Sequence, residues 1–495
     1  MTISITASML YNFVQCPHRL NLDLHEDPAN RDPESKFVQL LWEKGTAFEQ
    51  EVIQNLAVPF TDLSAQPGDK RERLTSEAMN RGDELIYAGR IRAGNLLGDP
   101  DLLRRQSNGY VAGDIKSGAG EEGASDVSDG KPKRHYAVQL SLYTDILEQI
   151  GISSGRFPFI WDIHGEEVVY KLDNPQGPRT PKTLWDLYKD TLQIAGEVCS
   201  QPGLTLPALG GTCKLCHWHT ACRSRLDEVE DLSLIPALGR AKRDAMIDHV
   251  QTVSQLANTD ITDMIKGNKT VIPGIGPGTL KKFQNRALLL VDPKAKPYLK
   301  TKLRFPSTKV ELFFDIETDP MRDICYLHGF VERTDQDSST ERYVLFFAET
   351  PSAEAEREAY SRAYAYVQSS QPCALYFYSK YERTWWRKLR EKYPDVATEE
   401  QIEAIFSPKT AVDLYYDVVV PYSEWPTNDH SIKTLASYLG FKWRDASPSG
   451  ADSIEWYHRW VDTNDPEIRK RILEYNEDDC RATRVLLDGI CTLND

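Results

Sequence analysis

The sequence of 495 residues lacks any apolar run that approaches the ~20 residues a helix needs to cross a bilayer. Its N-terminus lacks a basic segment followed by an apolar core, so no signal peptide is predicted. We therefore expect a cytoplasmic protein without a membrane partner. Cysteine is scarce, and an odd count of nine in a reducing compartment favours metal ligation for the clustered ones over disulfides.

Glutamate is absent from the centre of the chain. Residues 232–309 hold fourteen Lys and Arg against five Asp, a net charge of +9, although the whole chain carries −15. A basic centre between acidic flanks indicates a nucleic-acid contact beside carboxylate-rich sites. For residues 294–309 alone, a solvated linker face is the better interpretation.

Four cysteines can form one metal centre that joins the beginning of a domain to its end. One lies far upstream before a proline and three follow a C-x2-C-x5-C spacing: Cys16, Cys213, Cys216 and Cys222. Zinc is one candidate, because His217 or His219 can complete a tetrahedral site with three thiolates. A four-thiolate iron–sulfur cluster is the other candidate, and spacing alone leaves the choice open.

Two predicted strands in the first third each bring an acid to a strand end, Asp101 and Asp114. The two-residue period of a strand places Lys116 on the same side as Asp114. Such a pair suits phosphodiester hydrolysis, because the carboxylate holds a divalent cation while the ammonium orients water and offsets phosphate charge.

Two predicted helices extend this pattern. Glu49 follows Gly45 by four residues in the first, and Gln139 and Tyr143 share a face of the second. Together with the two acidic strands, these motifs resemble, in order, the PD-(D/E)XK nucleases of the RecB type. The four flanking cysteines are similar to those of the iron–sulfur subset of that family, which includes the CRISPR-adaptation nuclease.

This resemblance covers about residues 1–225. It implies a Mg²⁺ or Mn²⁺ site, a catalytic lysine, two supporting residues and a structural [4Fe–4S] cluster on the four cysteines, with zinc as the alternative. The residues that correspond to the site are Glu49, Asp101 and Asp114, then Lys116, then Gln139 and Tyr143. Many relatives carry His where this chain has Glu49, and Glu ligates either cation equally well. Residues 118–133, rich in small and charged residues, are predicted to form a flexible loop.

Residues 271–283 fit a helix-hairpin-helix turn. Gly274 and Gly276 allow a tight backbone turn, and Lys281 and Lys282 add positive charge next to amides that can bind a phosphate. Residues 234–243 look like a degenerate copy. A helical spacer is the alternative interpretation, and a linker is predicted over 293–306.

The last third opens on an apolar strand that ends in Asp315-x-Glu317, with both acids on one side. The following pattern predicts a β-β-β-α-β order. Glu382 lies at the start of a later helix, and Tyr475 and Asp479 share a face of the last one. Converging acids of this kind can hold two divalent cations about 4 Å apart, which clamp the scissile phosphate and generate hydroxide.

This second pattern resembles the DEDD exonucleases of the RNase H-like superfamily, in the tyrosine-containing subtype. The resemblance spans about residues 306–495 and implies 3′→5′ exonuclease chemistry with Mg²⁺ or Mn²⁺. Glu382 stands where an Asp is usual. Asp413 also resembles a family position, although helix capping explains it equally well. A degenerate RNase H-like fold used only for binding is the alternative.

The whole chain resembles RecB-family nucleases that fuse the two domains, so we expect an α/β multidomain protein. The expected division is a PD-(D/E)XK domain over 1–225, a helix-hairpin-helix region over 226–305 and an RNase H-like domain over 306–495. The leading hypothesis is a DNA nuclease with two active sites that acts on single strands or ends in repair, recombination or mobile-element defence. A non-catalytic adaptor for a helicase or integration complex and an RNA-processing exonuclease are the alternatives.

Overall fold

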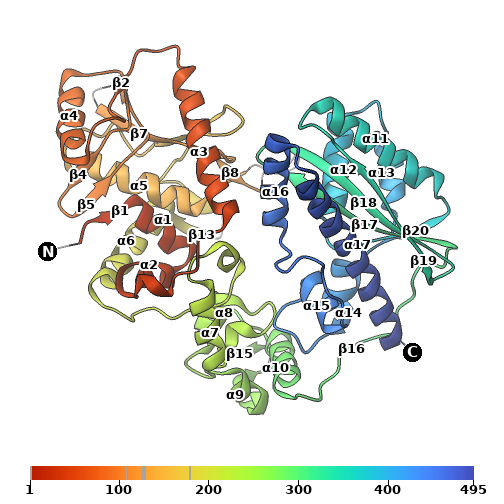
Figure 1. The fold of residues 1–495 in the computed structure, drawn as a ribbon. Helices are drawn as coiled ribbons and strands as arrows, with labels where there is room; N and C mark the ends of the chain where they lie inside the picture. Colours follow the sequence, from red (N-terminus) through yellow and green to blue (C-terminus); the bar gives the residue numbers. More distant parts are fainter. Residues whose placement is uncertain (1–2, 108, 124–129, 178–179, 495) are drawn as a thin grey trace. The chain divides into compact units, whose positions relative to one another are not determined.

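The chain folds into two compact units with mixed α/β structure. The computed structural model describes residues 3–107, 109–123, 130–177 and 180–494. Unit 1 comprises residues 1–207 and 211–223, and unit 2 comprises 208–210 and 224–495 (Figure 1). Among the described residues, no helix is both long enough and apolar enough to cross a bilayer.

Unit 1 is built on a six-stranded mixed sheet. Its strands lie in the order β11 (Glu167–Val169), β10 (Phe159–Trp161), β7 (Gly109–Ile115), β6 (Leu102–Gln106), β3 (Leu85–Tyr87) and β2 (Thr61–Asp62). All of β7 is buried, because alternate residues pack on opposite faces. Tyr110 and Ala112 join the cluster that contains α5 (Arg134–Gln149), so Asp114, of the same parity, points toward this helix.

The N-terminal helices of unit 1 are tied to the cysteine-rich segment. Cys16 separates α1 (Ala7–Gln15) from α2 (Pro17–His25). Asp23 on α2 accepts a hydrogen bond from the indole N–H of buried Trp218 at 2.9 Å and lies 2.8 Å from the ring of His217. Residues 211–223 therefore belong to unit 1 rather than to the unit that follows them in sequence.

The remaining elements of unit 1 are short strands and surface helices. They are α3 (Lys36–Gln54), α4 (Gly68–Arg81), α6 (Leu184–Ser200), β1 (Ile5–Thr6), β4 (Ile91–Ala93), β5 (Leu96–Gly98), β12 (Pro175–Gly177), β13 (Thr180–Thr183), η1 (Pro28–Asn30) and η2 (Gly211–Leu215), followed by α7 (His219–Glu228). Within the predicted flexible loop over 118–133, β8 (Glu121–Glu122) pairs with β9 (Lys131–Pro132), so part of this segment forms a short hairpin ladder. Residues 124–129 of that prediction lie outside the described residues.

Unit 2 contains a five-stranded sheet. Its order is β19 (Asp337–Phe347), β18 (Ile324–Thr334), β17 (Val310–Asp319), β20 (Cys373–Phe377) and β21 (Ala411–Asp413), with the first three antiparallel and the last two parallel to β17. Since α11 (Ala353–Ser369) precedes β20, the β-β-β-α-β order predicted from the sequence is confirmed.

Helices cover both faces of this sheet (Figure 1). Leu312, Phe314 and Ile316 of β17 pack in the cluster that contains α11 and α12 (Tyr381–Lys392). Phe313 packs in the cluster that contains α17 (Pro466–Asn494). Because strand residues alternate, every odd-numbered residue of β17 up to the bulge after residue 317 faces α17.

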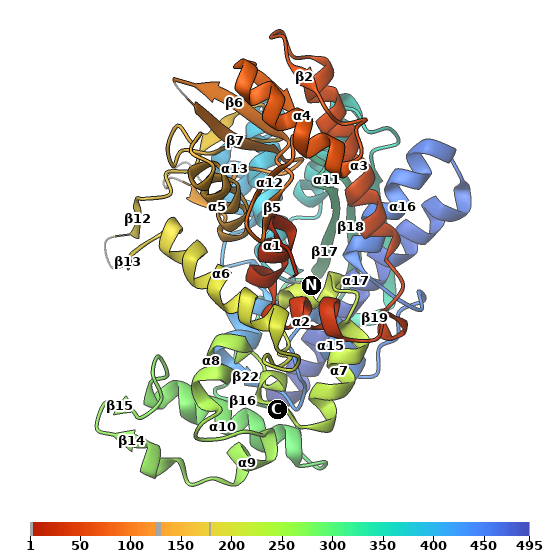
Figure 2. The ribbon, with the colours of Figure 1, turned by 90° about the vertical axis from the view of Figure 1, so that its left-hand side faces the viewer.

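A helical region precedes this sheet in unit 2. Its helices α8 (Gly239–Met246), α9 (Val253–Asn258) and α10 (Pro277–Val291) enclose a small core of their own (Figure 2). The predicted linker over 293–306 is wrong in part, because β16 (Tyr298–Leu299) pairs with β22 (Ser423–Glu424). Its other elements are η3 (Leu232–Leu234), η4 (Ile261–Met264), β14 (Ile265–Lys266) and β15 (Lys269–Thr270). The remaining helices of the domain that contains the five-stranded sheet are α13 (Glu399–Ile405), η5 (Leu414–Val419), α14 (Val420–Tyr422), α15 (Ile432–Tyr438) and α16 (Gly450–Thr463).

A buried ion pair joins the helical region to β22. Arg286 on α10 donates to Glu424 at 2.7 Å and to the carbonyl of Pro236 at 2.6 Å, and both charged side chains are almost fully buried. Lys300 lies 2.8 Å from the other oxygen of Glu424. Although burial raises the pKa of Glu424, its hydrogen bonds with the two cations hold it below the ordinary value. The helical region is thus part of unit 2.

Removal of one partner from this pair tests the junction. We expect Arg286→Met to destabilise unit 2 by about 3–5 kcal/mol, because Glu424 then stays buried without its guanidinium. Lys281→Met, on the exposed side of the same helix, is the matched control. Denaturant unfolding measures the loss of stability, and limited proteolysis measures how much faster sites beyond residue 224 are cut. Equal stability of the two variants would show that the junction does not hold the region in place.

Candidate active sites

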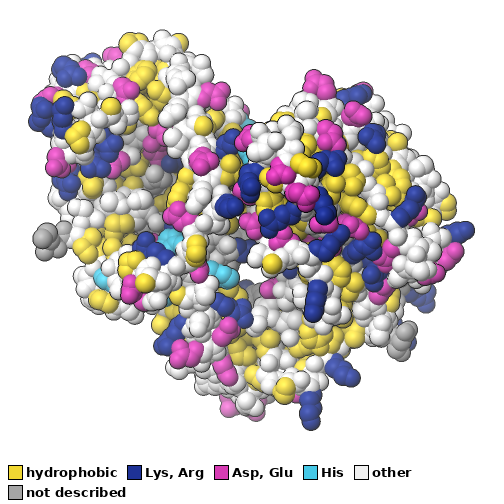
Figure 3. Space-filling model, viewed as in Figure 1, with side chains coloured by type: hydrophobic (Ala, Val, Ile, Leu, Met, Phe, Trp, Pro, Cys, Tyr) yellow, Lys and Arg dark blue, Asp and Glu magenta, His cyan; other side chains and the backbone are white. Residues whose placement is uncertain are grey.

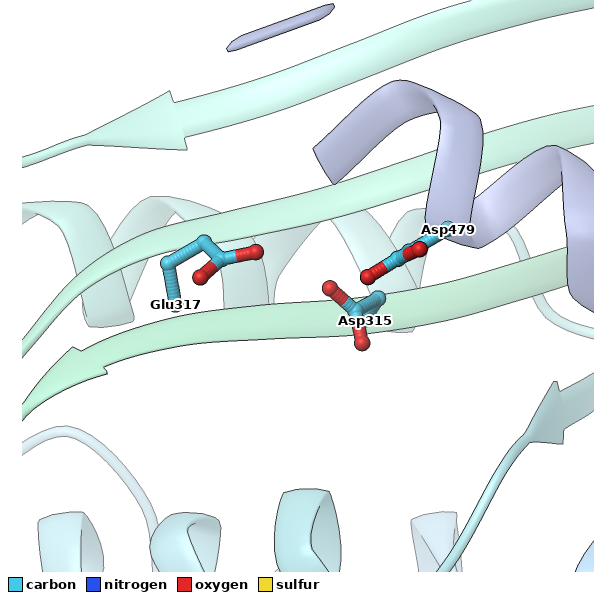
Figure 4. Close-up of side chains that lie close together, drawn as sticks. All are labelled: Asp315, Glu317 and Asp479. Carbon is cyan, nitrogen blue, oxygen red and sulfur yellow. The ribbon is translucent and has the colours of Figure 1, made fainter. Parts of the chain in front are cut away.

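Three acids of unit 2 converge on one point. Asp315 and Glu317 are odd-numbered residues of β17 and face α17, which carries Asp479. One carboxylate oxygen from each lies within 4.8 Å of the others (Figure 4). Among the described residues, no other set of three His, Cys, Asp or Glu side chains meets this spacing. The alternation of the strand and one turn of the helix therefore assemble a cluster of acids that is a candidate cation site.

The acids open into a pocket of about 270 Å³. Its lining combines the three carboxylates with aromatic and small residues: Asp315, Ile316, Glu317, Thr318, Tyr381, Gly450, Ile454, Tyr475 and Asp479. The hydroxyl of Tyr381 lies 2.6 Å from that of Thr318, so the ring is held at the edge of the pocket.

Glu382 is a fourth acid beside the same cluster. It lies buried in the first turn of α12, and burial together with the charges of Asp413 and Asp479 raises its pKa to about 8. Asp413 accepts the backbone N–H groups of Tyr415 and Tyr416 at 3.0 Å, which is the capping role that the sequence suggested. Its charge nevertheless acts on Glu382, so it also contributes to the electrostatics of the site.

Burial and mutual repulsion dominate the electrostatics of the acids. Burial, then Glu317 and Asp479, hold the pKa of Asp315 well above its ordinary value. Burial and Asp479 raise the pKa of Glu317 to about 8. A group of carboxylates that resists ionisation in this way favours the binding of cations, which remove the repulsion.

Sequence patterns did not reveal Asn476, which orients Asp315. Its side-chain amide donates to Asp315 at 2.7 Å and accepts from the hydroxyl of Tyr343 at 2.8 Å. Gly329, opposite Asp315 on β18, makes room for this contact, because a Cβ there would lie 1.7 Å from the Asn476 oxygen. The neighbouring Tyr475 motif was the available signal, since Asn476 follows it directly.

Lys433 and Trp443 also were not predicted. The ammonium of Lys433, on α15, donates to the Tyr475 hydroxyl at 2.8 Å and lies 3.7 Å from Asp479. The indole of Trp443 donates to Asp479 at 2.7 Å. Burial and the nearby acids raise the pKa of Tyr475 well above its ordinary value, so its hydroxyl keeps its proton at neutral pH.

In unit 1 the structure brings Asp101, Asp114 and Lys116 close together, whereas Glu49 and these two acids do not meet the spacing of the cluster in unit 2. Lys116 lies 3.0 Å from Asp114, and the backbone N–H of Asp101 approaches Asp114 at 3.3 Å. Asp101 lies in the turn before β6 rather than at a strand end, which corrects the sequence prediction. Its carboxylate accepts from the N–H of Ile115 at 2.8 Å. Burial and Asp114 hold its pKa well above the ordinary value.

Glu49 and the pair on α5 flank these residues. Glu49 accepts from the hydroxyl of Tyr87 at 2.9 Å, and both Glu49 and Asp101 contribute to the raised pKa of that tyrosine. Gln139 donates to the Tyr143 hydroxyl at 3.2 Å, and Tyr143 donates to the carbonyl of Asp99 at 3.3 Å. The predicted supporting pair therefore holds the turn that leads to Asp101.

The four predicted cluster ligands lie on neighbouring segments of unit 1. Cys213 is in η2, Cys216 follows it, Cys222 is in α7, and Cys16 caps α2. Burial raises the pKa of the Cys216 thiol, and the charges of Cys16 and Cys213 raise it further, which places these three thiols together. His217, a possible zinc ligand by sequence, contacts Asp23.

The predicted nucleic-acid contacts lie at the start of α10. Gly274 adopts a φ of +74°, which favours glycine, and Gly276 precedes the first helical residue. A Cβ at either glycine would meet no atom within 4 Å, so the turn is open on the outside. Lys281 is exposed and Lys282 half-buried in the next turn.

The repulsion among the acids makes stability depend on pH. An acid whose pKa is raised by folding destabilises the folded state above its ordinary pKa near 4.5, and the full cost is reached above the folded value of about 8. We expect Glu317→Gln to raise the melting temperature of the metal-free protein at pH 8 by several degrees and to have no effect at pH 4.5. At about 2–4 °C per kcal/mol, calorimetry resolves this difference. An equal gain from exposed Glu391→Gln would contradict the account.

One family model matches part of the chain. Residues 312–491 match the RNase_H superfamily. This range begins in β17 and ends in α17, and it contains the four acids of the candidate site, Asp315, Glu317, Glu382 and Asp479. No curated protein matches the chain. The C-terminal part of unit 2 is therefore an RNase H-like domain, which indicates a nucleic-acid hydrolase, and nucleases with this fold use divalent cations such as Mg²⁺ or Mn²⁺ at acidic clusters.

Proposed function

We propose that this protein is a divalent-metal-dependent DNA nuclease whose RNase H-like domain removes nucleotides from 3′ ends of single strands. The observation that carries the proposal is the convergence of Asp315, Glu317 and Asp479 at one open pocket. Glu382 supplies a fourth carboxylate and Tyr475 a hydroxyl at the pocket wall. This combination is the one that the DEDD resemblance implies for the site.

The chemistry follows from the residues around the pocket. Asp315, Glu317, Glu382 and Asp479 would hold Mg²⁺ or Mn²⁺, which when bound supplies an activated water and stabilises the negative charge of the transition state. Tyr475 keeps its proton and orients the attacking water through its hydroxyl. Lys433 fixes that hydroxyl by a direct hydrogen bond. Asn476 holds Asp315 at the angle that faces the pocket.

Unit 1 carries the proposed second nuclease site. Glu49, Asp101 and Asp114 would hold the cation, and Lys116 would act on the attacking water and the phosphate. The Asp114–Lys116 contact of 3.0 Å and the support from Gln139 and Tyr143 favour this assignment. We propose the PD-(D/E)XK fold for this unit, and a role in repair, recombination or mobile-element defence beside a helicase or integration protein.

We further propose that Cys16, Cys213, Cys216 and Cys222 hold a structural [4Fe–4S] cluster. The grouping of three thiols and the bonds of Asp23 to the same segment support a staple between the N-terminal helices and residues 211–223. Ferredoxin-like four-thiolate ligation fits a donor set without an obligatory histidine.

Substitution of one acid in each unit separates the two proposed sites. With Mn²⁺ and a 5′-labelled single strand, we expect Asp315→Ala to reduce stepwise 3′→5′ trimming by on the order of 10²–10³-fold, because a metal ligand is lost. Asp114→Ala should leave that trimming intact and remove the cleavage products of the proposed site in unit 1. Asp462→Ala, an exposed acid on α16, is the control. Trimming that survives Asp315→Ala would overturn the assignment, and an RNA strand cut faster than DNA would favour the RNA-processing alternative.

Metal analysis tests the cysteine site. Anaerobically purified protein should be brown, with broad absorbance near about 400 nm and four irons per chain on the four-thiolate assignment. Cys216→Ser should lose the colour, whereas Cys373→Ser, a buried cysteine of β20, should keep it. A colourless protein with one zinc per chain would replace the iron–sulfur assignment with a zinc site.

A further inference from the structure

The cations of unit 2 are neutralised very unevenly. Of the 21 Lys and Arg in residues 310–495, 17 lie within 4.0 Å of a carboxylate oxygen. The Lys and Arg side chains of the RNase H-like domain are therefore largely neutralised by acids of the same domain. In Figure 3, Lys and Arg side chains alternate with Asp and Glu over α16 and α17.

The helical region shows the opposite pattern. Among its fourteen Lys and Arg over residues 232–309, Arg243, Arg286 and Lys300 form ion pairs. Leaving Arg240 aside, the other ten form none within the described part of the chain. The region contains no glutamate and five aspartates, so it lacks the acids to pair with them. The helical region therefore carries positive charge that its own acids do not neutralise.

Several of these cations gather on one face around α10. Lys242 on α8 lies over the ring of Phe283 at 5.7 Å. Burial lowers the pKa of Lys282, and the charges of Arg286, Lys300 and Lys242 lower it further, with Glu424 as the one acid that acts in the opposite direction. Lys282 therefore lies close enough to the other three cations to be repelled by each of them. The open glycine turn at 274–276 lies one helical turn before Lys281 and Lys282.

The same face is connected to the RNase H-like site through one short segment. Residues 424–433 begin at Glu424, the partner of Arg286, and end at Lys433, which binds Tyr475. Within it, Asn428 donates to the carbonyl of Leu234 at 3.2 Å, and the carbonyl of His430 accepts from Tyr378. The basic face and the pocket thus belong to the same compact unit.

We propose that the α8–α10 face, centred on Lys242, Lys281 and Lys282, binds the phosphate backbone of a single strand whose 3′ end occupies the RNase H-like pocket. This inference deepens the proposed function by giving the substrate-binding surface of that site. A polyphosphate chain fits because it neutralises a row of cations that the protein leaves without acids, and because its binding releases counterions. A nuclease domain whose own cations are paired gains its affinity for substrate from this face.

Salt-dependent binding tests the proposal. In a background of Asp114→Ala and Asp315→Ala, anisotropy with a labelled 20-nucleotide single strand gives Kd at several salt concentrations. Because each phosphate contact contributes about 0.7 to the slope of log K against log salt, the triple variant Lys242→Gln, Lys281→Gln, Lys282→Gln should have a slope shallower by about 2. The double variant Lys281→Gln, Lys282→Gln, which keeps Lys242, should have a slope shallower by about 1.4. The control is Lys70→Gln, Lys171→Gln, Lys409→Gln, three exposed lysines outside the region, which should keep the original slope.

The outcome is independent of cleavage. Equal slopes for the triple variant and its control would overturn the proposed surface. Polyglutamate of the same charge that competes for binding as well as an unlabelled single strand would also overturn it and would indicate an acidic protein partner instead. With the intact active sites, the triple variant should raise KM for 3′→5′ trimming at least fivefold and leave kcat within twofold. If no variant or wild-type chain trims DNA while the slope still changes, the proposed nuclease activity fails and the binding surface stands.

Discussion

The repulsion among buried carboxylates is the constraint on which unit 2 depends. Asp315, Glu317, Glu382 and Asp479 come from one strand and two helices, and burial alone makes their charges costly. The surrounding structure compensates by fixed donors: Asn476 toward Asp315, Trp443 toward Asp479 and Lys433 toward Tyr475. The fold thereby places an acidic cluster, held by these donors, at the wall of the pocket.

A second consequence concerns the division of labour in the unit. The domain that carries the acids pairs nearly all of its cations internally, and the excess positive charge resides in the helical region that Arg286 and Glu424 attach to it. Separation of the acidic cluster from the basic face of the helical region prevents the two from neutralising each other. The buried junction keeps them in one unit, so charge separation does not require a flexible link.

Sequence patterns predicted much of this arrangement where the signal is local. The period of a strand placed Asp315 and Glu317 on one side, and the period of a helix placed Tyr475 beside Asp479, because both depend only on neighbouring residues. The contacts of Asn476, Lys433 and Tyr87 were missed because each joins residues far apart in the chain. The pairing of residues 298–299 with 423–424 was missed for the same reason, and a stretch with few apolar residues was interpreted as a linker. Asp101 was placed at a strand end although Pro100 before it is a turn signal.

The central claim is that the acids of β17 and α17 form a divalent-cation site, and Mn²⁺ binding measures it most directly. In a chain with Asp114→Asn, which removes a ligand from the proposed site of unit 1, electron paramagnetic resonance should detect tightly bound Mn²⁺. Asp479→Asn should abolish that binding, and Asp462→Asn, an exposed acid on α16, should leave it unchanged. Mn²⁺ that binds equally well after Asp479→Asn would contradict the account.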